Sequence, residues 1–161
     1  MSSDRLTRRF ACLGLLGLAG CGFAPVYGNG PATRGQFAFQ TDESVIGFQL
    51  GTRLGERLGA ASSPRYVLKV AVRTSERAAA ITAAGDTVRL NIIGVADWSI
   101  VESASGAQLF TDRTEAFTSY AATGSTVATQ TTQDDARTRL GIILADMIVT
   151  RVLALSETLD P

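Results

Sequence analysis

Apolar residues recur at every fourth position between residues 45 and 58, which is the spacing of one face of an α-helix. Thr41–Ser44 precedes this stretch with good helix-starting side chains, and Ala60–Pro64 follows it, so we predict a helix at Val45–Leu58. Its apolar face comprises Ile46, Leu50, Leu54 and Leu58. A second four-residue repeat places glycines beside that face, at Gly47, Gly51, Gly55 and Gly59. Because glycine within a helix costs about 1 kcal/mol relative to alanine, this row favours close approach of another backbone; compositional drift is the alternative.

Four stretches alternate apolar and polar residues with the period of a β-strand. They cover Gln36–Gln40, Tyr66–Thr74, Thr87–Val101 and Gln108–Thr118. Turn residues at Ser103–Gly106 separate the last two strands, and Ala78–Gly85 is expected to be a flexible connector. In the longest strand, Trp98 lies on the apolar face and is expected in the core, whereas Ile93 and Val95 interrupt the polar face.

A long helix is predicted from about Val127 to Leu155. Its broad core stripe consists of Ala136, Leu140, Ile143, Leu144, Met147, Ile148 and Leu155. The opposite side carries Ile142, Val149 and Leu153, which predicts burial on two sides, once by the sheet and once by something else. The element order β-α-β-β-β-α predicts one α+β domain at residues 36–161. We expect a two-layer sandwich with a largely antiparallel four-stranded sheet and two helices on one face.

The N-terminus has the organisation of an export signal. Arg5, Arg8 and Arg9 precede the uncharged stretch Phe10–Gly20, which is about half the roughly 20 residues that a membrane-spanning helix needs. The residues that follow resemble a bacterial lipobox, namely Leu18, Ala19, Gly20 and Cys21. We therefore predict that residues 1–20 are a removed signal peptide and that Cys21 carries diacylglycerol and an N-acyl chain, with residues 21–35 as a tether. Export by the general or the twin-arginine route stays open.

The composition excludes several kinds of function. Without the signal peptide, 15 − 3 = 12 basic and 15 − 1 = 14 acidic residues remain, a net charge of −2 that does not suit nucleic-acid binding. The chain has no histidine, which removes the commonest general base and metal ligand. The adjacent acids Asp42–Glu43 and Asp134–Asp135 lie near predicted helix starts, where carboxylates favour the helix dipole. We therefore expect no enzyme, no metal and no bound cofactor; a cell-envelope hydrolase is the weaker alternative.

Basic side chains recur along the predicted strands, at Lys69, Arg73, Arg89 and Arg113. Such residues most often form the solvated face of a half-exposed sheet. Contact with anionic headgroups or with a protein partner is the second interpretation.

Two motifs resemble the LptE family of lipopolysaccharide-assembly lipoproteins, in its alphaproteobacterial form. Cys-Gly-Phe-Ala-Pro-Val-Tyr at Cys21–Tyr27 is similar to the family's mature N-terminus, and Gln133–Arg137 with Leu144–Val152 looks like its last helix. The resemblance implies a plug inside the outer-membrane barrel LptD that assists barrel folding and lipopolysaccharide delivery. Gly22 after the lipidated cysteine likewise suggests the outer membrane, on its periplasmic side.

The resemblance also assigns expected contacts. A barrel wall would cover the apolar residues left over on the last helix and the sheet, which are Ile142, Val149, Leu153, Ile93 and Val95. Enterobacterial relatives carry basic residues near a hairpin tip that meets lipopolysaccharide, but Ala78–Gly85 has no charge, so Arg77 and Arg89 are the nearest substitutes. The alternative function is an auxiliary lipoprotein of an ABC-type or phospholipid-trafficking system.

Overall fold

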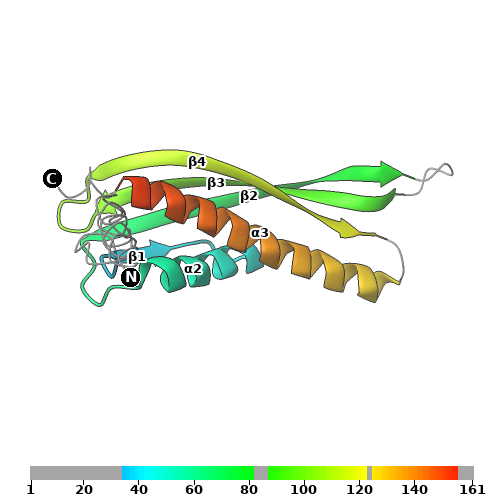
Figure 1. The fold of residues 1–161 in the computed structure, drawn as a ribbon, viewed down its shortest axis with the longest axis horizontal. Coiled ribbons are helices and arrows are strands. Elements are labelled where there is room, and N and C mark those ends of the chain that lie inside the picture. Colours follow the sequence, from blue (N-terminus) through cyan, green and yellow to red (C-terminus); the bar gives the residue numbers. More distant parts are fainter. Residues whose placement is uncertain (1–33, 82–86, 123–124, 156–161) are drawn as a thin grey trace, which may run out of the picture. The chain divides into compact units, whose positions relative to one another are not determined.

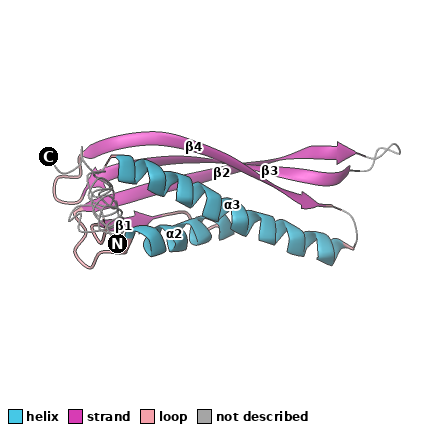
Figure 2. Ribbon diagram, viewed as in Figure 1, coloured by secondary structure: helices cyan, strands magenta, loops and turns pink. Residues whose placement is uncertain are grey.

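The computed structural model describes residues 34–81, 87–122 and 125–155, and these belong to one compact unit, Pro31–Pro161. Its elements are β1 (Phe37–Gln40), α2 (Val45–Leu58), β2 (Tyr66–Ile81), β3 (Thr87–Glu102), β4 (Gln108–Ala121) and α3 (Thr126–Ala154), as Figure 1 shows. The strands form a four-stranded sheet in the order β1-β2-β3-β4. β1 pairs with β2 in parallel, and the other neighbours are antiparallel. Both helices cover the same face of the sheet (Figure 2). The predicted α+β class and element order are therefore confirmed.

Two strands extend beyond their predicted ends. β2 continues to Ile81 and β4 to Ala121, so the prediction that Ala78 begins a flexible connector was wrong. Ala78 pairs with Leu90 and Ala80 with Arg89 across shifts in register. Pairing with β3 thus holds an alanine-rich segment extended, although its own sequence lacks strand alternation.

Local signals set the start of α2. The Ser44 side chain accepts a hydrogen bond from the backbone N–H of Gly47 at 3.0 Å, as an N-cap residue does. Just before it, Asp42 accepts bonds from the N–H groups of Ser44 at 3.0 Å and of Val72 at 3.2 Å. Partial burial acts to raise the pKa of Asp42, but hydrogen bonds from the Ser44 side chain and from backbone N–H groups, including those of Ser44 and Val72, outweigh it, so the pKa lies below its ordinary value. This carboxylate therefore ties the start of α2 to strand β2.

The glycine row on α2 meets another backbone at its two ends. A Cβ at Gly47 would lie 2.3 Å from the carbonyl oxygen of Asp42, and one at Gly59 would lie 3.3 Å from the backbone nitrogen of Gly35. At Gly51 the nearest atom is the Thr41 hydroxyl at 3.1 Å, and at Gly55 nothing lies within 4 Å. The predicted close approach of a backbone is therefore confirmed at Gly47 and Gly59 but not between them.

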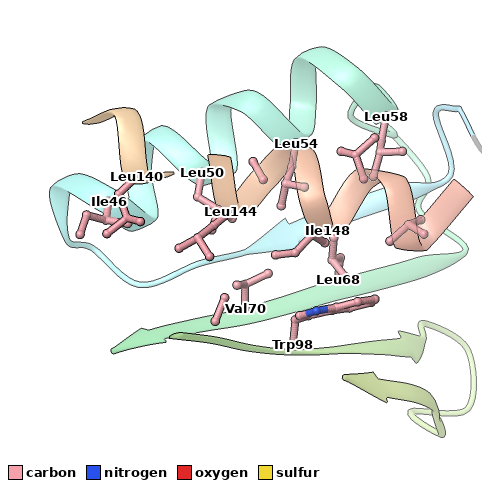
Figure 3. Packing of buried hydrophobic residues seen from close by; sticks show 14 of the residues in the cluster. Ile46, Leu50, Leu54, Leu58, Leu68, Val70, Trp98, Leu140, Leu144 and Ile148 are labelled. Carbon is pink, nitrogen blue, oxygen red and sulfur yellow. The ribbon is translucent and has the colours of Figure 1, made fainter. Parts of the chain in front are cut away.

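The core lies between the two helices and the inner face of the sheet (Figure 3). Leu50, Leu54 and Leu68 are fully buried there, and Trp98 is only 2% exposed, which confirms its predicted place. The indole Nε1–H donates to the hydroxyl of Thr114 at 3.0 Å. Since a buried donor without a partner would be costly, this pair satisfies the one polar atom of the indole and fixes its orientation.

Candidate partner-binding surface

The position of α3 is set by a close contact with α2. A Cβ at Gly141 would lie 2.8 Å from the backbone oxygen of Ile46, so only glycine allows the helices this separation. Further along, the Arg53 guanidinium donates to both carboxylate oxygens of Asp146, at 3.0 and 3.1 Å. One flank of α3 is therefore covered by α2, while β3 and β4 lie beneath it.

This arrangement corrects the predicted faces of α3. Val149, expected on a partner-facing ridge, is 1% exposed and belongs to the core, whereas Ile143 and Met147, expected in the core, are 39% and 43% exposed. Ile142 and Leu153 are half-buried. The buried arc is rotated by roughly a quarter turn from the predicted stripe, because α2 and the sheet cover adjacent sides of α3 rather than one side.

The outer face of the sheet carries the second set of predicted contacts. Ile93 and Val95 are half-buried on this face, which none of the described helices covers. Phe117 of β4 lies directly opposite Ile93 and is 64% exposed. A hollow of about 350 Å³ beside this pair is lined by Asn91, Ile93, Glu115, Ala116 and Phe117. Phe117 was missed because the faces of its strand looked mixed in the sequence.

Charged side chains surround these apolar residues on the outer face. Asp97 accepts hydrogen bonds from the guanidinium groups of Arg113, at 2.6 Å, and of Arg73. The bond from Arg113 is the main reason why the pKa of Asp97 lies below its ordinary value. Arg73 and Arg113 are therefore paired within the sheet, and Lys69 is exposed on the same face.

Arg77 and Arg89 are both exposed near the end of the β2–β3 hairpin. Arg77 pairs in register with Asn91, two residues from Arg89, so the two side chains project from the outer face as diagonal neighbours. Within the described part of the chain, neither forms an ion pair.

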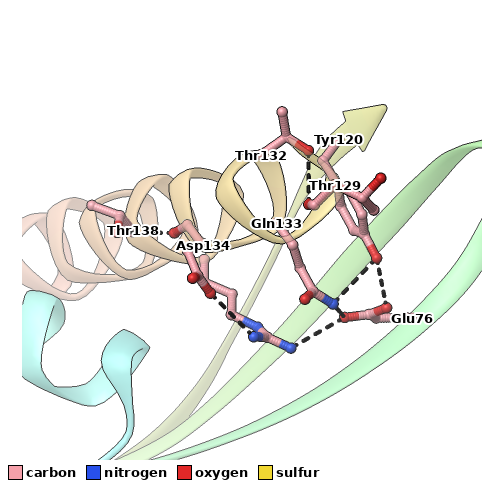
Figure 4. A network of polar contacts seen from close by, with 8 residues as sticks. Glu76, Tyr120, Thr129, Thr132, Gln133, Asp134 and Thr138 are labelled. Atoms are coloured by element: carbon pink, nitrogen blue, oxygen red, sulfur yellow. Dashed lines mark hydrogen bonds and ion pairs between the residues drawn. The ribbon is translucent and has the colours of Figure 1, made fainter. Parts of the chain in front are cut away.

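A polar network joins the first half of α3 to the inner face of the sheet (Figure 4). The Tyr120 hydroxyl donates to Glu76 at 3.0 Å, and the Gln133 amide donates to the other oxygen of Glu76 at 2.8 Å. The Arg137 guanidinium lies 3.5 Å from the carboxylate of Glu76. Burial, assisted by the Glu76 charge, raises the pKa of Tyr120. These contacts cross from β2 to β4 and α3, so they position the helix.

Both acids of the pair Asp134–Asp135, which lies within α3 and not near its start, have structural partners. Asp134 lies 3.4 Å from Arg137 and Asp135 lies 2.9 Å from Arg139, one helical turn along α3. Among the described residues, no cluster of acids, histidines or cysteines could hold a metal ion, and no described helix is long and apolar enough to cross a membrane. Leu18, Ala19, Gly20 and Cys21 lie outside the described residues, so the predicted lipidation stays a prediction.

The fold was compared with those of known proteins. The sequence matches no family model and none of the curated proteins. A protein described as a lipoprotein from Caulobacter crescentus matches with a TM-score of 0.66 at 20% identity, over 79% of this chain and 94% of that one. Rare lipoprotein B from Shewanella oneidensis matches at 0.61 and 12% identity, over 78% and 99%. Lipoprotein B from Nitrosomonas europaea matches at 0.58 and 10% identity, over 79% and 86%. The chain therefore has the fold of rare lipoprotein B, the LptE-like fold.

Proposed function

We propose that this protein is an outer-membrane lipoprotein, anchored on the periplasmic side through Cys21, that partners the lipopolysaccharide-export barrel LptD as its plug and assembly factor. The observation that carries the proposal is an LptE-like fold in a chain with a lipobox at Leu18–Cys21. The motif that continues to Tyr27, similar to the LptE family's mature N-terminus, supports it independently. The protein acts by contact rather than by catalysis.

The apolar residues of the outer sheet face are the proposed barrel-facing contacts. Ile93 and Val95 share this face with Phe117, and a luminal wall would remove all three from water. Ile142 and Leu153 remain candidate contacts at the margin of α3, whereas the burial of Val149 removes it from the set. Contiguous exposed apolar surface of this kind marks interaction sites.

Arg77 and Arg89 are the proposed lipopolysaccharide contacts. Two guanidinium groups with no described acidic partner can donate charge-assisted hydrogen bonds to phosphate groups. Replacing both by serine should weaken binding of purified lipopolysaccharide and reduce its salt dependence. An Arg34→Ser control, at an exposed arginine outside the hairpin, should bind lipopolysaccharide as well as the wild type does, which would show that the loss is specific to the hairpin.

Recovery of the barrel tests the main proposal. The acylated chain is purified from detergent-solubilised outer membrane, and its partners are identified by mass spectrometry. We expect LptD with the wild-type chain and much less with Cys21→Ser, which cannot be acylated. Recovery of an inner-membrane transporter complex instead would favour the auxiliary lipoprotein alternative and refute the barrel assignment.

The outer face is tested by a paired substitution. Ile93→Asp with Val95→Asp places two charges where the wall is proposed to lie, and should strongly reduce recovery of the barrel. Val127→Asp is the matched control, because Val127 is 72% exposed at the start of α3. If the double variant retained the barrel as well as the control does, this face would not be the interface.

A further inference from the structure

The free edge of β4 presents unpaired backbone groups. β4 ends the sheet order, so it has β3 as its only neighbouring strand in the described chain. The N–H of Ala122 donates to the carbonyl of Val88 at 3.1 Å, and the pairing then runs without a shift to Ile100 with Phe110. Since antiparallel pairs alternate between bonded and non-bonded positions, even-numbered residues of β4 bond to β3. Odd-numbered residues direct N–H and C=O outward.

Side chains occupy this edge at both ends but not at its centre. The N–H of Arg113 donates to its neighbour Asp112 at 2.8 Å, and the carbonyl of Ser119 accepts a bond from Arg139 at 3.3 Å. Between them, none of the described residues bonds to the outward backbone groups of Glu115 and Phe117. The centre of the edge therefore offers two donors and two acceptors in the geometry of a strand-pairing site.

Hollows lie on both faces of the sheet at this point. The outer hollow, beside Ile93 and Phe117, has been described above. An inner hollow of about 360 Å³ lies between β4 and α3 and is lined by Arg113, Thr114, Glu115, Met147, Thr150 and Arg151. Glu115 borders both hollows, and the exposed side chains of Met147 and Phe117 lie one on each side of the edge. A strand added here would find an apolar contact for side chains on both of its faces.

The opposite edge of the sheet, on β2, differs in its backbone hydrogen bonds and in its exposed side chains. Beyond the end of β1, the N–H of Val72 on β2 is bonded to Asp42, and the exposed neighbours on the outer face include the charged Arg73 and Arg77. None of the large apolar side chains that the described residues expose belongs to β2. Charged edges of this kind discourage pairing. β4 also carries exposed charges, at Arg113 and Glu115, but it adds the exposed Phe117, and this apolar contact distinguishes the two edges.

We propose that the centre of β4, Glu115–Phe117, binds an extended segment of the partner barrel, which joins the sheet as an additional strand. This proposal rests on the function proposed above. The bound segment would carry apolar side chains at alternate positions, to fill the two hollows. Exposed arginines border the site, Arg113 and Arg151 at one end and Arg139 at the other, with side chains 65%, 68% and 51% exposed. Each is paired through its Nε with one acid of this chain, and its remaining guanidinium donors can bind an acidic flanking residue of the bound segment.

The side chains at the centre of the edge disfavour a second copy of this chain as the occupant. Two β4 strands paired antiparallel about Ala116 would place Glu115 of each copy directly opposite Phe117 of the other. Each exposed phenylalanine would then face a carboxylate, whereas a segment with an apolar residue at that position gains a cross-strand contact.

The test removes the outward donor without touching the ladder to β3. Glu115→Pro deletes one outward N–H, and an edge strand tolerates proline at such a position; Glu115→Gln controls for the charge. Thr74→Pro is the matched control on the other edge. On β2, the even-numbered residues direct their backbone N–H and C=O groups away from β3, because Tyr66 donates its N–H to Gln36 of β1 at 3.1 Å. The N–H of Thr74 therefore points outward, as that of Glu115 does on β4.

A second variant leaves the backbone unchanged. Phe117→Asp with Met147→Asp places charges in the two hollows, and Phe48→Asp on α2 is its control, since Phe48 is 67% exposed. Full-length acylated chains are co-expressed with the barrel, and recovered LptD is quantified after thermal unfolding shows that each variant folds. We expect both edge variants to recover about tenfold less barrel than their controls, the loss typical of removing a central contact.

The outcomes separate the two proposals. If the wild-type chain recovers the barrel and the edge variants recover as much, strand addition at β4 is wrong while the proposed function stands. If the wild-type chain recovers no barrel, the proposed function fails and this inference fails with it. If the edge variants lose only self-association, measured by light scattering, the occupant is a second copy and the barrel segment is excluded.

Discussion

Replacing Gly141 by alanine should weaken the packing of α3 on α2. The added Cβ would lie 2.8 Å from the carbonyl oxygen of Ile46 and 3.3 Å from the backbone nitrogen of Leu50. Both neighbours are backbone atoms, so relief requires one helix to shift, and overpacking of this kind costs about 1–3 kcal/mol. Alanine gains about 1 kcal/mol of helix propensity over glycine in return. The expected net change in unfolding free energy is a loss of between about zero and 2 kcal/mol.

Comparison with Gly55→Ala isolates the free-energy cost of the steric contact at Gly141. Gly55 also lies inside a helix, but nothing lies within 4 Å of the position that its added Cβ would take, so only the propensity gain of about 1 kcal/mol applies. The propensity terms cancel between the variants, which should differ in unfolding free energy by about 1–3 kcal/mol, with Gly55→Ala the more stable. Urea unfolding followed by circular dichroism, on chain produced without residues 1–21, measures both. Equal changes would refute the claim that glycine sets the helix separation.

Three further outcomes follow from the core and from Asp42. Leu144→Ala, at a site 0% exposed, should lower the urea-unfolding free energy by about 2–5 kcal/mol. Thr114→Val leaves the indole donor of Trp98 unpaired and should cost about 1–3 kcal/mol, with a change in tryptophan fluorescence. The lowered pKa of Asp42 contributes stability that is present above the ordinary carboxyl pKa of about 3.9 and lost as pH falls below it. Urea titrations over pH should show Asp42→Asn less stable than wild type at pH 7 and equal to it in acid.

Local signals in the sequence were sufficient to predict much of the fold. The bounds of α2 at Val45–Leu58 agree with the structure because Ser44 caps one end and Gly59, at φ 74°, ends the other. β2 was predicted too short because the segment Ala78–Ile81 is held by pairing with β3 rather than by its own alternation. Long-range pairing of this kind leaves no signal in the segment itself.

The candidate surface was harder to predict, since it depends on what covers each side of α3. Apolar residues occur on more than one side of this helix, and sequence periodicity alone does not say which side α2 covers. The decisive contact is Gly141 against Ile46, a pairing between distant residues. It turns Val149 inward and leaves Ile143 and Met147 at the margin near β4. Phe117 was missed for a related reason, because its exposure depends on which face of β4 meets α3.

The inner face of the sheet contributes to folding stability, whereas the outer face is the proposed binding surface. Ile92 and Trp98 of β3 face the helices and are almost fully buried, so substitutions there remove packing that the isolated chain depends on. Phe117 of β4 faces away from the helices, and 64% of its surface is already in water in the isolated chain, whereas Ile93 beside it is half-buried. A polar replacement of Phe117 therefore forfeits little folding free energy, while Ile93→Asp removes some packing as well. A loss of barrel recovery caused by Phe117→Asp would consequently report on the interface and not on unfolding, which makes this position the most direct point at which to test the proposed function.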